Sequence, residues 1–236
     1  MNINGSVALV TGANRGLGDR FVRALLQAGA RKVYAAARDP RRIRVRAEGV
    51  VPIALDITDP AAVRSAAEQA PDVTLLVNNA GSFSGGPVLD GDLDAFRTDF
   101  ETHVLGTLAV SRAFAPVLAR NGGGAILNVL SVLSWLTLPH AAAYCAAKSA
   151  AWSVTNALRL RLADQGTQVS ALHVGYMDTD MTAELDQPKS DPADIARIAL
   201  EGLDQGLYEI VADAGSRRVL GDLSVGVEAL YPQLAH

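Results

Sequence analysis

The sequence predicts an α/β fold: a doubly wound parallel sheet of about seven strands, of the Rossmann type, with helices on both faces. Seven short runs rich in Val, Ile and Leu recur along the 236 residues. Each is apolar on both faces, as strands buried inside a parallel sheet are. Helical stretches alternate with these runs, and that alternation produces right-handed βαβ units. We expect one domain over residues 1–236.

The predicted strands are all too short to form a helix of normal length. They are Val7–Val10, Val33–Ala37, Val50–Leu55, Val73–Val77, Ala125–Val129, Val169–Val174 and Glu209–Ala212.

The predicted helices lie between the strands, and Asp59 and Asp191 stand where N-caps are expected. The helices are Leu17–Ala28, Pro60–Ala70, Leu93–Leu118, Ala141–Ala163 and Pro192–Leu203. The third is unusually long, which leaves open a break within it. After about Gly215 the pattern is less regular, with a short helix expected at Ser216–Leu223.

Composition narrows the class of protein. The chain is 49% apolar and 19% charged, as ordinary globular domains are, and its net charge is −4. Clustered Lys and Arg, which nucleic-acid binding needs, are confined to Arg38–Arg46. The single Cys145 excludes an intramolecular disulfide and fits a reducing compartment. We find no secretory signal and no uninterrupted apolar stretch near the about 20 residues that span a bilayer. We expect a cytoplasmic protein without a metal, a nucleic-acid partner or a membrane partner.

A glycine-rich turn follows the first predicted strand and opens the first helix, at Thr11–Gly18. The glycines permit a tight turn and close approach of the backbone to a pyrophosphate, to which the helix N-terminus presents free N–H groups. The alternative is an ordinary loop. The position between strand and helix favours dinucleotide binding.

The end of the second strand indicates which dinucleotide binds. NAD sites usually place Asp or Glu there to bind the ribose 2′-hydroxyl, whereas this sequence reads Ala36-Ala37-Arg38. A guanidinium group suits a 2′-phosphate, and Arg15 offers a second cation. The alternative is that Arg38 is a solvated surface charge and Asp39 binds the ribose. We predict NADP(H).

Tyr144 and Lys148 are four residues apart on a predicted helix and share one face. A free phenol has a pKa of about 10, and an adjacent ammonium group is expected to lower it, which suits proton transfer. Ser131 follows the fifth strand, where it can hold a substrate oxygen as charge develops. The alternative is an ordinary surface pair. Ser131, thirteen residues before Tyr144, argues against it.

The chain resembles the short-chain dehydrogenase/reductase family from about residue 5 to 182. The resemblance is carried by Thr11–Gly18, by Asn78–Gly81, and by Ser131 with Tyr144 and Lys148 at the family's spacing. It implies an NADP(H)-dependent oxidoreductase that moves a hydride to or from a carbonyl carbon. The carbonyl compound or alcohol is its small-molecule partner.

The resemblance also implies site residues. Asp56 would contact the adenine amine, Thr179 the nicotinamide carboxamide, and Lys148 the ribose. The full expected cofactor set is Gly12, Asn14, Arg15, Gly16, Leu17, Gly18, Arg38, Asp56, Ile57, Asn79, Ala80, Gly81, Tyr144, Lys148, Val174, Gly175, Met177 and Thr179.

Three departures from the family pattern matter. His103 replaces an Asn whose main-chain carbonyl commonly holds a water that joins Lys to solvent. A carbonyl remains, so His103 can keep this relay, and its imidazole, which titrates near neutrality, could also take part. A tolerated substitution is the favoured alternative. Val174-Gly175 replaces Pro-Gly, and the tail differs, which puts the family's usual tetramer contact in doubt. We expect a homodimer or homotetramer.

The loop after Ser131 supplies the predicted substrate wall. Leu133, Trp135 and Leu138, with Tyr176, would form an apolar, partly aromatic surface. That surface favours a hydrophobic or aryl ketone or aldehyde, although these residues could equally belong to the core. The favoured activity is carbonyl reduction with NADPH. The same site acting as an alcohol dehydrogenase and a non-catalytic NADP(H)-binding regulator stay open.

Overall fold

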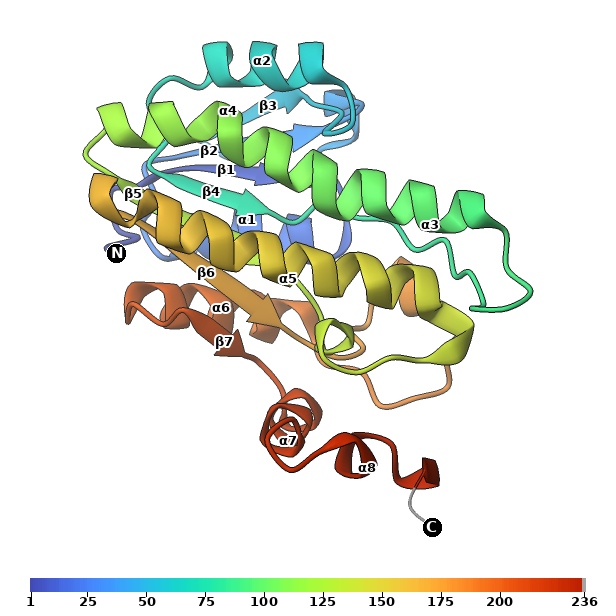
Figure 1. Ribbon diagram of the computed structural model, residues 1–236. Coiled ribbons are helices and arrows are strands. Elements are labelled where there is room, and N and C mark those ends of the chain that lie inside the picture. Colours follow the sequence, from blue (N-terminus) through green and yellow to red (C-terminus); the bar gives the residue numbers. More distant parts are fainter. Residues whose placement is uncertain (235–236) are drawn as a thin grey trace.

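The computed structural model describes residues 1–234, and its centre is a seven-stranded parallel sheet in the order β3-β2-β1-β4-β5-β6-β7 (Figure 1). The strands are β1 Val7–Thr11, β2 Lys32–Ala37, β3 Val50–Ala54, β4 Leu75–Asn78, β5 Gly124–Val129, β6 Thr167–His173 and β7 Glu209–Val211. The predicted fold class and all seven predicted strands are confirmed, with bounds shifted by one or two residues.

Helices cover both faces of the sheet (Figure 1). On one face lie α1 (Gly16–Gln27) and α6 (Pro192–Asp204), which pack beside each other. On the other face lie α2 Pro60–Gln69, α3 Leu93–Phe100, α4 Thr107–Arg120 and α5 Ala142–Leu162. Apolar clusters lie on both faces, because most strand residues are apolar and buried on either side of the sheet.

The sequence left open a break in the long third helix; the helix is continuous but changes its winding. Residues Glu101–Gly106 form a π-helix between α3 and α4, and this segment contains His103. Among the described residues, only the run Leu93–Arg120 has the length and apolar composition of a membrane span. Its Phe114 and Leu118 are fully buried against the sheet, as in a core helix.

The tail forms α7 (Ala214–Asp222) and α8 (Val227–Leu230). The expected short helix is confirmed and begins two residues earlier, where Asp213 caps it by accepting a bond from the Ser216 N–H at 2.8 Å. The backbone N–H of Thr137 donates to the Tyr231 hydroxyl at 2.9 Å. The tail therefore contacts the loop that follows Ser131.

The strand order reverses between β1 and β4, because β1 pairs with β2 on one side and with β4 on the other. Connections from these two strands leave toward opposite faces and open a crevice at their carboxyl ends. In open α/β sheets this crevice is where ligands bind.

Candidate functional site

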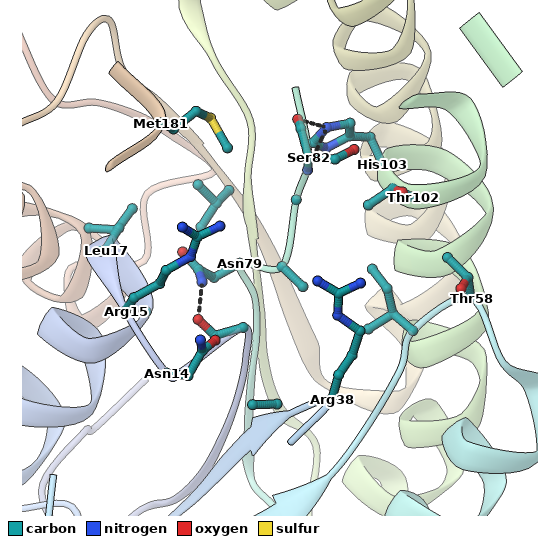
Figure 2. A pocket seen from close by; sticks show the side chains of 18 of the residues that line it. Asn14, Arg15, Leu17, Arg38, Thr58, Asn79, Ser82, Thr102, His103 and Met181 are labelled. Atoms are coloured by element: carbon teal, nitrogen blue, oxygen red, sulfur yellow. Dashed lines mark hydrogen bonds between the residues drawn. The ribbon is translucent and has the colours of Figure 1, made fainter. Parts of the chain in front are cut away.

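A cleft of about 980 Å³ opens at the carboxyl ends of the central strands. It brings together residues that lie far apart in the sequence, and Figure 2 shows part of its lining. The predicted site residues that line it are Gly12, Asn14, Arg15, Gly16, Leu17, Gly18, Arg38, Asp56, Ile57, Asn79, Ala80, Gly81, His103, Tyr144, Lys148, Met177 and Thr179.

The glycine-rich turn forms one wall. A Cβ atom on Gly18 would collide with the carbonyl oxygen of Gly12 and would lie 2.7 Å from the Asn79 side-chain nitrogen. That nitrogen donates to the Thr11 carbonyl at 2.9 Å and ties the turn to the segment after β4. The N-cap residue of α1, Arg15, makes no side-chain cap bond, so the first N–H groups of the helix stay available for an anion.

Cations gather at the end of the cleft beside β2. Arg38 lines it as predicted, and Arg42 joins it from the following 3-10 turn. Asp39 also lines the cleft, but its carboxylate accepts from the Arg41 side chain at 2.9 Å, a bond that lowers the pKa of Asp39. Arg15 reaches into the same space (Figure 2) and pairs with Asp180 at 3.2 Å.

Lys148 lies at the other end of the cleft, on α5. Its Nζ donates to the Val129 carbonyl at 2.9 Å and lies 5.4 Å from the centre of the Tyr144 ring. Burial lowers the pKa of Lys148 to about 7, although the negative charge of Asp99 acts in the opposite direction. A buried ammonium group loses hydration that a single distant carboxylate does not replace.

Tyr144 packs edge-on against two rings. Its centre lies 5.1 Å from that of His103 and 5.4 Å from that of Phe83. Burial raises the pKa of Tyr144 well above its usual value, and a hydrogen bond with Ser131 only partly offsets this. The expectation of a lowered phenol pKa is therefore wrong for this structure, because desolvation of the phenolate and the negative charge of Asp99 both raise the pKa and outweigh Ser131.

Ser131 is held at the start of a short 3-10 helix, Val132–Ser134. Its Oγ accepts from the Leu133 N–H at 3.1 Å and donates to the Val174 carbonyl at 3.4 Å. Ser131 is buried and does not line the cleft, but it acts to lower the pKa of the Tyr144 phenol and so lies near that end of the cleft.

His103, on the π-helix, faces the Tyr144 ring. Its Nε2 lies 2.8 Å from the Ser82 carbonyl, a contact drawn in Figure 2, and a Cβ on Gly81 would approach its Cε1 to 2.7 Å. Burial lowers the pKa of His103 to about 3, and the Lys148 charge adds to this. The ring is neutral at physiological pH, so the expectation that it titrates near neutrality is wrong.

Asp99 is a functional candidate that sequence reasoning missed. It is fully buried and accepts hydrogen bonds from the hydroxyl groups of Ser82 at 3.0 Å and Ser84 at 2.9 Å. Its charge acts to raise the pKa of both Tyr144 and Lys148. An Asp on an amphipathic helix gives no signal that it points inward, so only the fold reveals it.

The expected substrate wall does not form as predicted. Trp135 is only 8% exposed because its ring stacks on His173, with the ring centres 3.7 Å apart. Leu133 and Leu138 line neither the cleft nor a second, smaller cavity of about 430 Å³. Tyr176 does line that second cavity.

Two expected cofactor residues also lie outside the cleft. Val174 is buried, and its carbonyl oxygen accepts from the Val132 N–H at 3.0 Å. The Gly175 N–H donates to Asp213 at 2.8 Å, and Gly175 lines the smaller cavity. These two hydrogen bonds hold the segment after β6 outside the cleft.

Other residues of the cleft were not anticipated. Several come from the long helix, whose cleft-facing side cannot be chosen before its packing is known. The cleft residues outside the predicted set are Ala37, Asp39, Arg42, Leu55, Thr58, Ser82, Arg97, Thr98, Glu101, Thr102, Val129, Leu130, Asp180 and Met181.

Comparisons with known proteins agree with this geometry. The family model of the short chain dehydrogenases matches residues 6–190. A short chain dehydrogenase from Burkholderia cenocepacia, crystallised in complex with NADP, is 40% identical over 100% of both chains, with a TM-score of 0.95.

Two further relatives are more distant. Galactitol 2-dehydrogenase (L-tagatose-forming) of Cereibacter sphaeroides is 34% identical over 192 residues, covering 78% of this chain and 76% of that protein. A 3-ketoacyl-(acyl-carrier-protein) reductase from Brucella melitensis, complexed with NADH, is 27% identical, with a TM-score of 0.82 over 91% of this chain and 99% of that one. The chain therefore belongs to the short-chain dehydrogenase/reductase family of oxidoreductases.

Proposed function

We propose that this oxidoreductase is a carbonyl reductase that uses NADPH to convert a ketone or aldehyde into an alcohol. One observation carries the proposal: a single cleft has Arg38 and Arg42 at one end and Tyr144 and Lys148 at the other. The NADP complex of the 40% identical relative supports the choice of cofactor.

The residues present fit NADP(H). The glycine turn and the N-terminus of α1 suit a pyrophosphate, and the approach of Gly18 to Gly12 leaves no room for a side chain. Arg38 and Arg42 would hold the 2′-phosphate. Asp39, which follows Arg38 and also lines the cleft, is instead engaged by Arg41. When bound, the cofactor supplies the hydride.

Tyr144 acts as the general acid. Its raised pKa keeps the phenol protonated at neutral pH, so it can donate a proton to the carbonyl oxygen as negative charge develops there. The Ser131 hydroxyl holds the same oxygen. Lys148 stands 5.4 Å from the phenol ring, where its positive charge stabilises the phenolate that proton donation leaves behind.

A hydrophobic or aryl substrate stays part of the proposal, with different contacts from those first expected. Phe83 is 48% exposed and packs against Tyr144, and Met181 lines the cleft. Phe83 offers an apolar surface beside Tyr144 in place of Trp135, and Met181 adds apolar surface elsewhere in the cleft.

The reverse reaction is the second candidate. Oxidation of an alcohol by the same residues is favoured by the resemblance to galactitol 2-dehydrogenase, which is named for such a reaction. A non-catalytic NADP(H)-binding regulator has less support, because Tyr144 and Lys148 both line the cleft and Ser131 acts on the pKa of Tyr144.

Replacing Tyr144 by Phe tests the proposal. We expect kcat for NADPH oxidation with a panel of aryl and alkyl ketones and aldehydes to fall at least about 100-fold, as loss of a general acid does, with NADPH affinity retained. The control is Tyr208→Phe, at an exposed tyrosine away from the cleft. Equal rates for the native protein and the Tyr144 variant would refute the catalytic role.

A further inference from the structure

His173, the last residue of β6, lies directly behind the Ser131 turn and is fully buried. Its Nδ1 is 3.2 Å from the Ser131 carbonyl oxygen, and its Nε2 is 2.8 Å from the carboxylate of Glu209 on β7. The Trp135 ring stacks on the imidazole at 3.7 Å and 15°. The ring is therefore fixed on three sides.

Both ring nitrogens of His173 face groups that can only accept hydrogen bonds. The Ser131 carbonyl and the Glu209 carboxylate therefore fix the orientation of the ring, because each can accept a hydrogen bond from the ring nitrogen that it faces. Burial acts to raise the pKa of Glu209, but hydrogen bonds from His173 and Trp152 outweigh it and the pKa is lowered.

Glu209 also holds the helix that carries the catalytic pair. It accepts from the Trp152 indole N–H at 3.2 Å and from Arg159 at 3.1 Å, and both of these residues are on α5. One carboxylate thus connects α5, which carries Tyr144 and Lys148, with the histidine that supports the Ser131 turn.

We propose that His173, oriented by Glu209, is a positioning residue that sets the place of Ser131 relative to Tyr144 and Lys148. The proposal rests on the proposed function for the catalytic meaning of that placement. Within the short turn, the Ser131 carbonyl otherwise accepts only the Ser134 N–H at 2.9 Å. A displacement of about 1 Å at such a group is enough to cost a large part of the rate.

Stability alone is a weak explanation for this pair. A hydrogen bond between a buried imidazole and a partly exposed carboxylate contributes little net stability, because both groups give up hydrogen bonds to water to form it. Trp135 and Trp152 already surround the site with apolar surface. The hydrogen bonds of His173 and Glu209 instead fix the position of the Ser131 turn, which apolar packing alone would allow to shift.

Two variants separate the two bonds of His173. In His173→Asn the amide nitrogen takes the place of Nδ1 and keeps the bond to Ser131. In His173→Gln it takes the place of Nε2 and keeps the bond to Glu209 only. We expect kcat within about threefold of native for Asn and about tenfold lower for Gln, with NADPH affinity unchanged in both.

A double-mutant cycle identifies the route of the effect. In a Ser131→Ala background the Asn and Gln variants are expected to have equal kcat values, because the group that His173 positions is absent. A tenfold loss for Gln that persists in this background would overturn the proposal, as would equal kcat values of the two variants in the native background.

A second readout does not depend on turnover. The Leu133 N–H donates to Ser131 Oγ, and its hydrogen exchange reports the order of the turn. We expect exchange at Leu133 and Ser134 to be about tenfold faster in His173→Gln and unchanged in His173→Asn. If the native protein reduces no carbonyl compound, the proposed function fails while this measurement still decides the positioning role. Equal exchange in both variants would refute it.

If the His173 variants do not fold, Glu209→Gln tests the same network. It keeps an oxygen acceptor for Nε2 but replaces the oxygen that accepts from Trp152 and Arg159 with an amide nitrogen, which cannot accept a hydrogen bond. We expect faster exchange at Leu133 and an about tenfold lower kcat, with Arg217→Gln as an exposed control. Native values of both quantities in Glu209→Gln would overturn the role of Glu209.

Discussion

Burial moves the pKa values of Tyr144, Lys148 and His103 in directions that suit proton donation to a substrate. Tyr144 keeps its proton, Lys148 has a pKa of about 7 and can exchange its proton near neutrality, and His103 stays neutral. A neutral histidine beside a cationic lysine avoids repulsion between two buried charges. The substitution of His for the family's Asn is therefore compatible with the catalytic group.

His103→Asn is expected to retain carbonyl reduction within about tenfold, because the main-chain carbonyl at this position is unchanged. A near-complete loss of turnover in a folded variant would contradict this and give the imidazole a role of its own.

The same variant is expected to be less sensitive to acid. The folded pKa of about 3 lies below the ordinary 6.5, so between these values the unfolded chain binds the extra proton and stability falls as pH falls. Replacing His103 is expected to reduce the slope of the unfolding free energy against pH by up to about 1.4 kcal/mol per pH unit. Urea unfolding at pH 4, 5 and 6 measures it, and an unchanged slope would contradict the burial argument.

The cofactor preference is a second question at the scale of single residues. Arg38→Ala and Arg42→Ala are each expected to weaken NADPH binding about tenfold, the effect of one charged hydrogen bond, and to leave NADH binding unchanged. Arg44→Ala, which removes an exposed charge from the same cluster outside the cleft, is the matched control. Calorimetric titration decides it, and an NADPH affinity unaltered in both variants would remove these residues from the 2′-phosphate site.

At the scale of elements, the contact between β1, α1 and β4 controls the shape of the phosphate end. Gly18 lies on the first turn of α1 and approaches the Gly12 carbonyl so closely that the turn and the helix form one unit. Asn79 fastens that unit to the end of β4. The nucleotide site therefore depends on backbone packing between elements as well as on side chains.

Gly18→Ala is expected to lower the free energy of unfolding by about 1–3 kcal/mol, as overpacking does, and to abolish detectable NADPH binding. Gly221→Ala is the control, because Gly221 lies on α7 with open space around it and is expected to be neutral or slightly stabilising. Thermal unfolding and nucleotide titration of both variants test this; native-like binding in Gly18→Ala would contradict it.

At the scale of the whole molecule, the outer side of one helical layer carries exposed apolar side chains. Phe100 and Leu105 lie on the long helix, and Leu160, which is 80% exposed, lies on α5. Exposed apolar surface of this kind favours association between copies of a chain. The predicted homodimer or homotetramer is retained as a proposal, and the predicted cytoplasmic location stays a prediction.

Leu160→Asp is expected to shift the assembly toward the monomer, because a carboxylate would have to lose its hydration in an interface. Val225→Asp, at an exposed position in the tail, is the control and is expected to keep the native mass. Light scattering after gel filtration measures both. A native protein that is monomeric at all concentrations, or equal masses for the two variants, would contradict this interface.

The sequence by itself determined the strand and helix order, the glycine turn, the position of Arg38 after β2, and the group of Ser131, Tyr144 and Lys148. These features depend on local patterns: apolar runs, a glycine spacing and residues one helical turn apart. The parallel sheet then places all strand ends on one edge, so motifs at those ends meet.

Only the tertiary structure decided which side chains face inward and what burial does to them. Trp135 is buried in the core, where its ring stacks on His173. Asp99 points inward, where it accepts hydrogen bonds from two serine hydroxyls. Arg42 lines the cleft because it lies on a 3-10 turn after β2. The pKa of Tyr144 rose because desolvation depends on the whole surrounding volume. The spacing of residues in the sequence reveals neither the contact partners of a side chain nor the volume around it, because both are formed by segments distant in the chain.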